Sequence, residues 1–184
     1  MTEVLFYHLE AQPLERVLPV LLEKTIQLDR GFACAYNALG VALARMNRQK
    51  EARAAFESAA SLTPEWALPP YQIASQLIAA GDLSKAVPYL EKAVAYSPGV
   101  LGTRWSLVRV YRLLKRTSQA EREAAELIRI NPNYAPVYTE LGLAYAADGK
   151  FAQAAEALDT YVMLAPNFAD ANEVRALADR LRKR

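Results

Sequence analysis

Residues 33–66 read ACAYNALGVALARMNRQKEARAAFESAASLTPEW, and residues 135–168 read APVYTELGLAYAADGKFAQAAEALDTYVMLAPNF. The two stretches align without a gap, and residues 67–100 and 101–134 between them align in the same way. A proline and an alanine recur in these stretches at a spacing of 34 residues, at Pro64, Pro98, Pro132 and Pro166 and at Ala52, Ala86, Ala120 and Ala154. A fixed period of this length is typical of a chain that stacks one helix-turn-helix unit on the next.

The composition favours helices and gives little support to catalysis. Of the 184 residues, 53% are apolar, largely alanine and leucine, and only 7 are glycine, which suits close-packed helices. The net charge of +2 is too small to indicate nucleic acid or an anionic membrane as the main partner. The single cysteine excludes an intramolecular disulfide and a multi-cysteine metal site, and the single histidine leaves little for imidazole catalysis or zinc binding. We therefore expect no metal and no cofactor.

No part of the sequence predicts a membrane span or a secretory signal. No run approaches the roughly 18 apolar residues that a membrane span needs. The start of the chain lacks a positive segment, and the apolar stretch 17–22 is short and contains Pro19. If the chain is complete, a cytoplasmic location is expected. The pattern is equally compatible with a segment of a larger protein, because repeat arrays are often joined to other domains.

Each repeat contains two stretches with apolar residues on one helical face. In the first repeat, Tyr36, Leu39, Gly40 and Leu43 stand at i, i+3, i+4 and i+7. The second half follows the same principle in Ala52, Phe56, Ala59 and Leu62. Between the halves, Asn47, Gly81 and Gly149 tolerate the left-handed backbone that ends a helix. Lys115 stands at the fourth such turn and adopts this backbone less readily, so the sequence signal for that turn is the weakest.

The pattern resembles the tetratricopeptide repeat family, whose signature is W-x2-L-G-x2-Y, then A-x3-F, then P. The residues that match it in repeats one and four are Tyr36, Leu39, Gly40, Leu43, Ala52, Phe56 and Pro64, and Tyr138, Leu141, Gly142, Tyr145, Ala154, Leu158 and Pro166. The resemblance implies an all-α, right-handed superhelical solenoid of antiparallel helix pairs. The position of Gly40, called here the small column, holds Gly40, Ala74, Val108 and Gly142 in the four repeats, and the alanine column holds Ala52, Ala86, Ala120 and Ala154. A glycine or alanine of the small column that faces the alanine column is expected to let the two helices of a repeat approach closely.

The repeats divide the chain as one solenoid over residues 1–184. We predict a degenerate helix pair over 3–30, in which one helix runs through Val4–Glu10, the chain turns at Pro13, and a second helix covers Leu14–Leu28. Repeats one to four follow over 33–66, 67–100, 101–134 and 135–168, and a C-terminal capping helix with a polar outer face covers 169–183. Repeats two and three depart from the family pattern, because Pro70 and Arg104 replace the aromatic residue. Val108 replaces the small residue and is expected to push its helix away from the one that carries Ala120.

In the family that this sequence resembles, the first helix of each repeat lines a concave groove. The positions beside the core stripe give the candidate peptide-binding residues Asn37, Arg45, Tyr71, Gln72, Ser75, Trp105, Arg109, Arg112, Thr139 and Glu140. Trp105 stands out because Trp, Tyr and Arg are enriched in binding hot spots. The alternative is that Trp105 turns into the core to replace the aromatic residue missing at Arg104.

Arg109 and Arg112 lie three residues apart on the same helical face and would suit a carboxylate or an acidic peptide. The alternative is a solvated basic helix balanced by glutamates of the following helix, Glu121, Glu123 and Glu126. Some relatives hold the C-terminal carboxylate of chaperones with lysine and asparagine side chains. We do not expect that clamp, because the matching columns hold Asn37, Val41, Gln72, Gly102 and Ser106, and the required basic residues of the third repeat are absent.

The remaining reactive residues suggest no enzyme. Cys34, between Ala33 and Ala35, is interpreted as a small packed residue, and His8 as a surface or half-buried residue. No phosphate-binding glycine loop, metalloprotease helix or nucleophile elbow is present. The sequence therefore predicts a non-enzymatic interaction scaffold that holds a protein or peptide ligand, with acidic groups, in its groove. The alternative is a self-association module that forms a homo-oligomer through apolar residues near the N-terminus, Val4, Leu5, Phe6 and Leu9.

Overall fold

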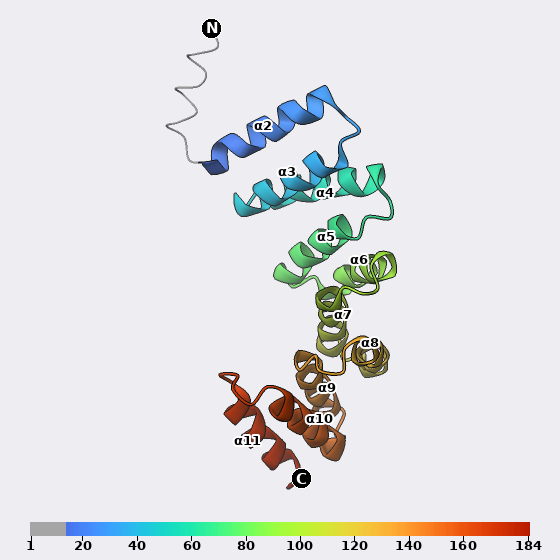
Figure 1. The fold of residues 1–184 in the computed structure, drawn as a ribbon, viewed down its shortest axis with the longest axis vertical. Helices are drawn as coiled ribbons and strands as arrows, with labels where there is room; N and C mark the ends of the chain where they lie inside the picture. The colour runs from blue at the N-terminus through green and yellow to red at the C-terminus, as the bar shows by residue number, and fades with distance from the viewer. Residues whose placement is uncertain (1–13) are drawn as a thin grey trace. The chain divides into compact units, whose positions relative to one another are not determined.

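The computed structural model describes residues 14–184 and contains only helices in this part of the chain (Figure 1). The helices are α2 Leu14–Leu28, α3 Ala33–Arg45, α4 Gln49–Leu62, α5 Leu68–Ala79, α6 Leu83–Tyr96, α7 Leu101–Leu113, α8 Thr117–Ile130, α9 Pro136–Ala147, α10 Phe151–Leu164 and α11 Ala171–Leu181. The second helices of the four repeats begin at residues 49, 83, 117 and 151, which keeps the period of the sequence. The predicted all-α repeat fold is therefore confirmed. The helix expected over Val4–Glu10 lies outside the described residues, and so does His8.

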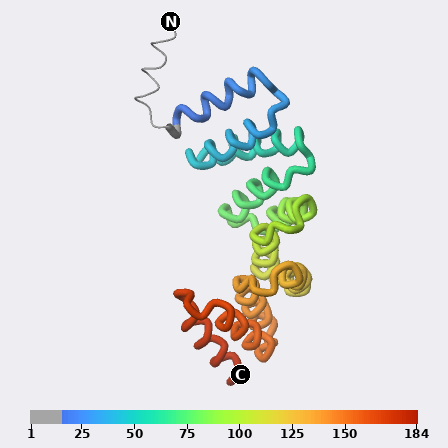
Figure 2. Tube along the Cα trace, in the orientation of Figure 1, coloured from blue at the N-terminus to red at the C-terminus, as the bar shows by residue number. Residues whose placement is uncertain are grey.

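The chain separates into two compact units, Met1–Gln76 and Leu77–Arg184, which are called here the N-terminal and the C-terminal unit. In the N-terminal unit, α3 packs against both α2 and α4. In the C-terminal unit, α7 contacts α6, α8 and α9, and α10 lies between α9 and α11; the path of the chain through these helices can be followed in Figure 2. A second helix thus packs on the first helix of its own repeat and on that of the next repeat. This arrangement brings first helices of successive repeats, such as α7 and α9, side by side.

The glycines of the small column accept the large side chain of the partner helix. A Cβ atom added to Gly40 would lie 2.5–2.9 Å from three ring atoms of Phe56. A Cβ atom on Gly142 would lie 2.7 Å from Cγ and Cδ2 of Leu158 and 3.1 Å from the carbonyl oxygen of Ala154. The sequence predicted that these glycines face the alanine column. The Ala154 backbone is close to Gly142, and in both repeats the nearest neighbour is the large residue four positions after the alanine.

In repeat three, the larger of the two facing residues lies on the first helix and the smaller on the second helix. Val108 replaces the glycine, and Ala124 stands at the position equivalent to Phe56 and Leu158. Both Val108 and Ala124 are fully buried, as is Ala120. Because Ala124 is smaller than Phe56 or Leu158, it offsets part of the volume that the valine adds, and the displacement of the helix by Val108 stays a prediction. The core of repeat three therefore stays closed to solvent.

All four turns inside the repeats have the same backbone conformation. The φ angle is positive at Asn47 (62°), Gly81 (80°), Lys115 (57°) and Gly149 (74°). After each of these residues, the next backbone N–H donates to a carbonyl five residues earlier, as from Arg116 to Tyr111 at 2.9 Å. This is the hydrogen bond of a Schellman helix end. The turn at Lys115 is therefore as regular as the others, although its sequence signal was the weakest, and the lysine holds a conformation that favours glycine.

Replacing Lys115 with glycine is expected to stabilise the protein. A left-handed residue with a side chain costs about 1–2 kcal/mol, and the greater flexibility of unfolded glycine returns about 0.5–1 kcal/mol of this. We expect the free energy of unfolding, measured by urea denaturation, to rise by up to about 1 kcal/mol. Lys115→Ala, which keeps Cβ but loses the charge, is the control. If the glycine variant is no more stable than the alanine variant, backbone strain at this turn is negligible.

The C-terminal helix α11 covers the end of the array. Val174, Ala178 and Leu181 are buried, and α11 packs against α10 (Figure 1). The Tyr161 hydroxyl donates to Asp170 Oδ1 at 2.5 Å; burial, together with this bond, raises the pKa of Tyr161 to about 12. The outer side chains of α11 are polar and exposed, which confirms the predicted cap. Within residues 14–184, no helix combines the length and the apolar character needed to cross a membrane.

Candidate functional site

The first helices of repeats three and four carry the best-defined candidate surface. Trp105 on α7 and Thr139 on α9 hold the same position in successive repeats, and the two helices are in contact. The guanidinium of Arg109 lies 5.7 Å from the centroid of the Trp105 ring, one helical turn away on the same face. Arg109 is exposed, Trp105 is partly exposed, and no ion pair joins Arg109 to any residue of the described chain. We call these two side chains the Trp105–Arg109 pair.

Trp105 and the equivalent residue of α9, Thr139, each contain a buried polar atom. The indole Nε1 of Trp105 and the hydroxyl oxygen of Thr139 have no hydrogen-bond partner within the described residues. Neither atom is accessible to solvent, so water cannot supply the missing hydrogen bond. A buried polar group without a partner costs free energy. The surface around this pair is therefore not optimised for stability alone.

The position expected for an aromatic residue in repeat three is filled by Arg104. This side chain is buried, its Nη1 pairs with a carboxylate oxygen of Glu123 on α8, and its Nη2 donates to the Pro98 carbonyl at 3.5 Å. Arg104 thus occupies the aromatic column itself, and Trp105 keeps part of its ring exposed under Arg109. The sequence analysis did not identify this buried ion pair. The sequence feature that could have indicated this ion pair is the charged Arg104 at a position where the other repeats have apolar or aromatic residues.

Arg112 and Glu140 form an ion pair with each other. Nε of Arg112 lies 2.5 Å from Oε2 of Glu140, and the two side chains are only 20% and 10% exposed. The sequence analysis treated them as two separate ligand-binding residues on neighbouring helices. Because Glu140 already neutralises Arg112, the expected pair of free guanidiniums is reduced to Arg109. The pair also ties α7 to α9.

The glutamates of α8 do not balance the arginines of the candidate surface. Glu121 pairs with Lys150 at 3.3 Å, and Glu126 pairs with Arg129 at 3.0 Å. Glu123 is taken up by Arg104. The alternative of a basic helix neutralised by α8 therefore fits Arg104 but does not describe Arg109.

The other candidate residues lie in the N-terminal unit, which is described separately. Asn37 is buried, and its Oδ1 has no partner within the described chain. Ser75 donates to the Tyr71 carbonyl at 2.9 Å, a bond within α5, while Gln72 is partly buried. Two further residues, Arg45 and Cys34, are exposed. The interpretation of Cys34 as a small packed residue was wrong, because only its neighbours Ala33 and Ala35 point into the core.

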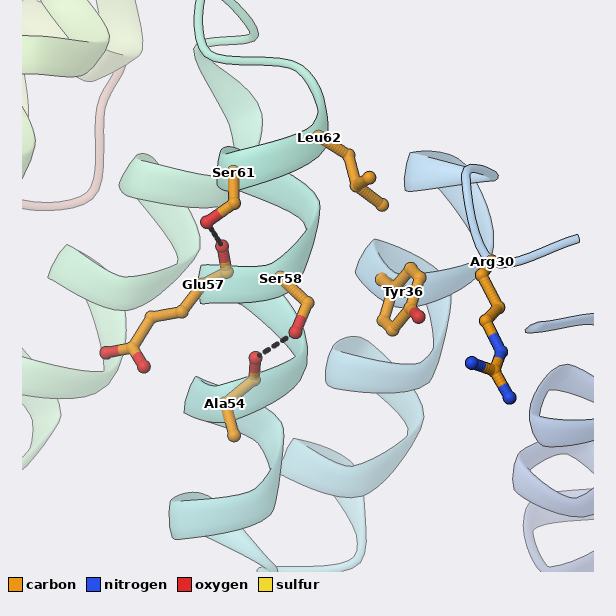
Figure 3. Close-up of a pocket in the computed structure, with 7 residues that line it drawn as sticks. All are labelled: Arg30, Tyr36, Ala54, Glu57, Ser58, Ser61 and Leu62. Atoms are coloured by element: carbon orange, nitrogen blue, oxygen red, sulfur yellow. Dashed lines mark hydrogen bonds between the residues drawn. The ribbon is translucent and has the colours of Figure 1, made fainter. Parts of the chain in front are cut away.

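Sequence analysis missed a surface cleft in the N-terminal unit. Its volume is about 510 Å³, and it lies between α4 and the side chains of Arg30 and Tyr36 (Figure 3). Its floor consists of small residues, which no motif search singles out. Among the side chains of residues 16–184, no cluster of three or more His, Cys, Asp and Glu could hold a metal ion.

Sequence profiles of the tetratricopeptide repeat match residues 34–65, 77–138 and 135–168. The chain is 24% identical to YrrB, a tetratricopeptide repeat protein with an unusual peptide-binding site, with 92% of this chain and 84% of YrrB covered and a TM-score of 0.75. It is 21% identical to MamA from Desulfovibrio magneticus RS-1, with 82% and 91% covered and a TM-score of 0.68. It is 26% identical to TTC0263 from Thermus thermophilus, with 82% and 81% covered and a TM-score of 0.58. No curated protein matches the chain.

Proposed function

Because the chain belongs to the tetratricopeptide repeat family, whose repeats generally mediate protein–protein interactions, we propose that it binds a peptide or protein segment along the first helices of repeats three and four. The main contacts come from the Trp105–Arg109 pair. Members of the family are generally non-enzymatic scaffolds, and this protein acts in the same way. The observation that carries the proposal is an exposed arginine, free of ion pairs within the described chain, stacked on a partly exposed tryptophan.

The chemistry of the pair favours a ligand with one acidic group beside an apolar group. Cation–π attraction holds a guanidinium above an aromatic face. Because the arginine side chain is already ordered, it loses less conformational entropy when a ligand binds. Its fork of N–H donors suits a carboxylate. Trp and Arg are also the residues most enriched in binding hot spots. YrrB is described as having a peptide-binding site, which supports peptide binding in general by analogy.

Reversing the charge of Arg109 is expected to weaken binding of the ligand strongly. Arg109→Glu should weaken affinity for captured partners by about 30-fold or more, as expected for a hot-spot loss of about 2 kcal/mol. Trp105→Ala should act in the same direction. The measurement is affinity capture with mass spectrometry, followed by titration of the recovered partner at two salt concentrations, because screening weakens the Arg109 contact.

The matched control is Arg122→Glu, which reverses an exposed charge on the second helix α8 of the same repeat. It should leave capture unchanged. Arg112→Glu is unsuitable as a test, because it would set two carboxylates against each other at Glu140 and disturb the fold. If Arg109→Glu and Trp105→Ala retain the wild-type partners with wild-type affinity, the ligand binds elsewhere.

Self-association is the second candidate function, and the observation that favours it is the outer face of α2. Leu18, Leu21 and Leu28 are exposed on this helix, Leu28 to 90%. The residues first associated with this function, Val4, Leu5, Phe6 and Leu9, lie outside the described residues. Light scattering over a concentration series separates the two candidates, because a mass that stays monomeric at every concentration rejects self-association.

A further inference from the structure

The cleft in the N-terminal unit has no counterpart in the sequence-based sites. Figure 3 shows its arrangement: Ser58 on α4 points toward the Tyr36 ring, and Leu62 lies near the end of α4. Arg30 and Glu57 lie on opposite sides of the group. The hydroxyl of Ser58 donates to the Ala54 carbonyl at 3.0 Å and is therefore satisfied by its own helix. The floor of the cleft therefore consists of small side chains, and a charged side chain stands on either side of it.

Repeats two and three carry longer side chains at the position equivalent to Ser58, whereas repeat four has Thr160 there. The positions that correspond to Ser58 hold Lys92 and Glu126 in repeats two and three. Lys92 lies over the ring of Tyr96 at 5.7 Å, and Glu126 pairs with Arg129. Repeat one has neither the long side chains nor these contacts. The cleft therefore results from small residues at positions that longer side chains cover in repeats two and three.

Tyr36 also lacks a bond that its equivalent makes. In repeat four, the hydroxyl of Tyr138 donates to the Pro132 carbonyl at 3.0 Å. The residue equivalent to Pro132 in front of repeat one is Arg30. Tyr36 makes no corresponding bond to any described residue, so its hydroxyl is available at the edge of the cleft. A free hydroxyl beside an aromatic face suits a ligand with both apolar and polar groups.

Both charges of the cleft are unpaired within the described chain. The acidic residues equivalent to Glu57 in repeats two and four are engaged: Glu91 accepts the Tyr111 hydroxyl, and Asp159 pairs with Arg182. Repeat three has Ala125 at this position. Glu57 and Arg30 take part in no ion pair with a described residue and are both exposed. A ligand that presents a positive group to Glu57 and a negative group to Arg30 would complement both.

We propose that this cleft binds an extended peptide segment with a basic, an apolar and an acidic side chain in that order from Glu57 to Arg30. The apolar side chain lies against Tyr36 and Leu62, above Ala54. The acidic side chain meets Arg30, and the basic one meets Glu57. The site is independent of the Trp105–Arg109 pair, so the protein offers a second point of attachment to a ligand.

Blocked synthetic peptides test the proposal. The probes are KALAD and DALAK, acetylated and amidated, because the chain direction of the ligand is open; DALAD and KALAK are the same-charge controls. We expect saturable binding of at least one mixed-charge probe, seen by NMR titration of the amides of α4, about threefold to fivefold tighter than either control. Glu57→Lys should reverse this preference in favour of DALAD.

Two substitutions locate the binding. Ala54→Trp fills the cleft from an exposed position and should abolish binding of every probe. Ala95→Trp places the same bulk on the exposed face of α6, and Trp105→Ala removes the other candidate site; neither should affect the probes. The proposal is overturned if no mixed-charge probe binds at millimolar concentration, if Glu57→Lys leaves the preference unchanged, or if Ala54→Trp still binds.

Discussion

Gly142→Ala is expected to destabilise the protein by about 2 kcal/mol, although alanine is the better helix former by about 1 kcal/mol. The new Cβ would lie 2.7 Å from Cγ and Cδ2 of Leu158 and 3.1 Å from the Ala154 carbonyl oxygen. The leucine can turn only within a closed core, and the carbonyl belongs to the backbone of α10. Overpacking of this kind typically costs about 1–3 kcal/mol, so the clash outweighs the helix propensity. Urea denaturation followed by far-UV circular dichroism measures the loss.

Gly102→Ala is the matched control, because nothing lies within 4 Å of a Cβ atom at that position on α7. It should leave stability unchanged or raise it slightly. Adding Leu158→Ala to Gly142→Ala should cost less than the sum of the single changes, since the second substitution removes the clash of the first. A Gly142→Ala variant as stable as the wild type would contradict the close approach of α9 and α10.

Glu140→Ala is expected to cost about 2–3 kcal/mol, between the roughly 0–1 kcal/mol of an exposed ion pair and the 3–5 kcal/mol of a fully buried one. The reason is that Arg112, 20% exposed, would lose the carboxylate that lies 2.5 Å from its Nε. The guanidinium would then stay partly buried without a counter-charge. The same denaturation experiment measures the effect.

A matched pair of variants tests the cause. Glu156→Ala removes an exposed glutamate of α10 and should change stability by less than about 0.5 kcal/mol. Arg112→Met combined with Glu140→Met should recover most of the stability lost by Glu140→Ala, because two apolar side chains leave no charge unpaired. If Glu140→Ala is as stable as Glu156→Ala, the pair contributes nothing and Arg112 is free for a ligand.

The sequence was sufficient for the helices because their signals are local and repeated. The period placed the turns at Asn47, Gly81, Lys115 and Gly149, and all four have the same positive φ. Helix α2 begins directly after Pro13, as the proline predicted. Lys115 was the doubtful case, since residue preference there opposes the conformation. The packing of the repeat overrides this local preference.

The candidate surface was less predictable because side chains on different helices meet there. Helical spacing put Trp105 and Arg109 on one face, and the structure brings them together. Arg112 and Glu140 are 28 residues apart, and the spacing within either helix contains no information about their contact. The opposite charges of Arg112 and Glu140 were the one sequence feature that could have suggested an ion pair between them. The cleft beside Tyr36 was harder still, because it depends on small side chains at positions where repeats two and three have large ones.

The exchange of volume between the two helices of a repeat limits how such a chain can be rearranged during evolution. Gly142 is matched to Leu158, whereas Val108 is buried in a repeat that has Ala124 at the corresponding place. A recombination that moved one helix alone would combine valine with leucine, or glycine with alanine, and leave a clash or a hole. The smallest heritable module in this protein is therefore the complete helix pair, and duplication or loss is tolerated only when both helices travel together.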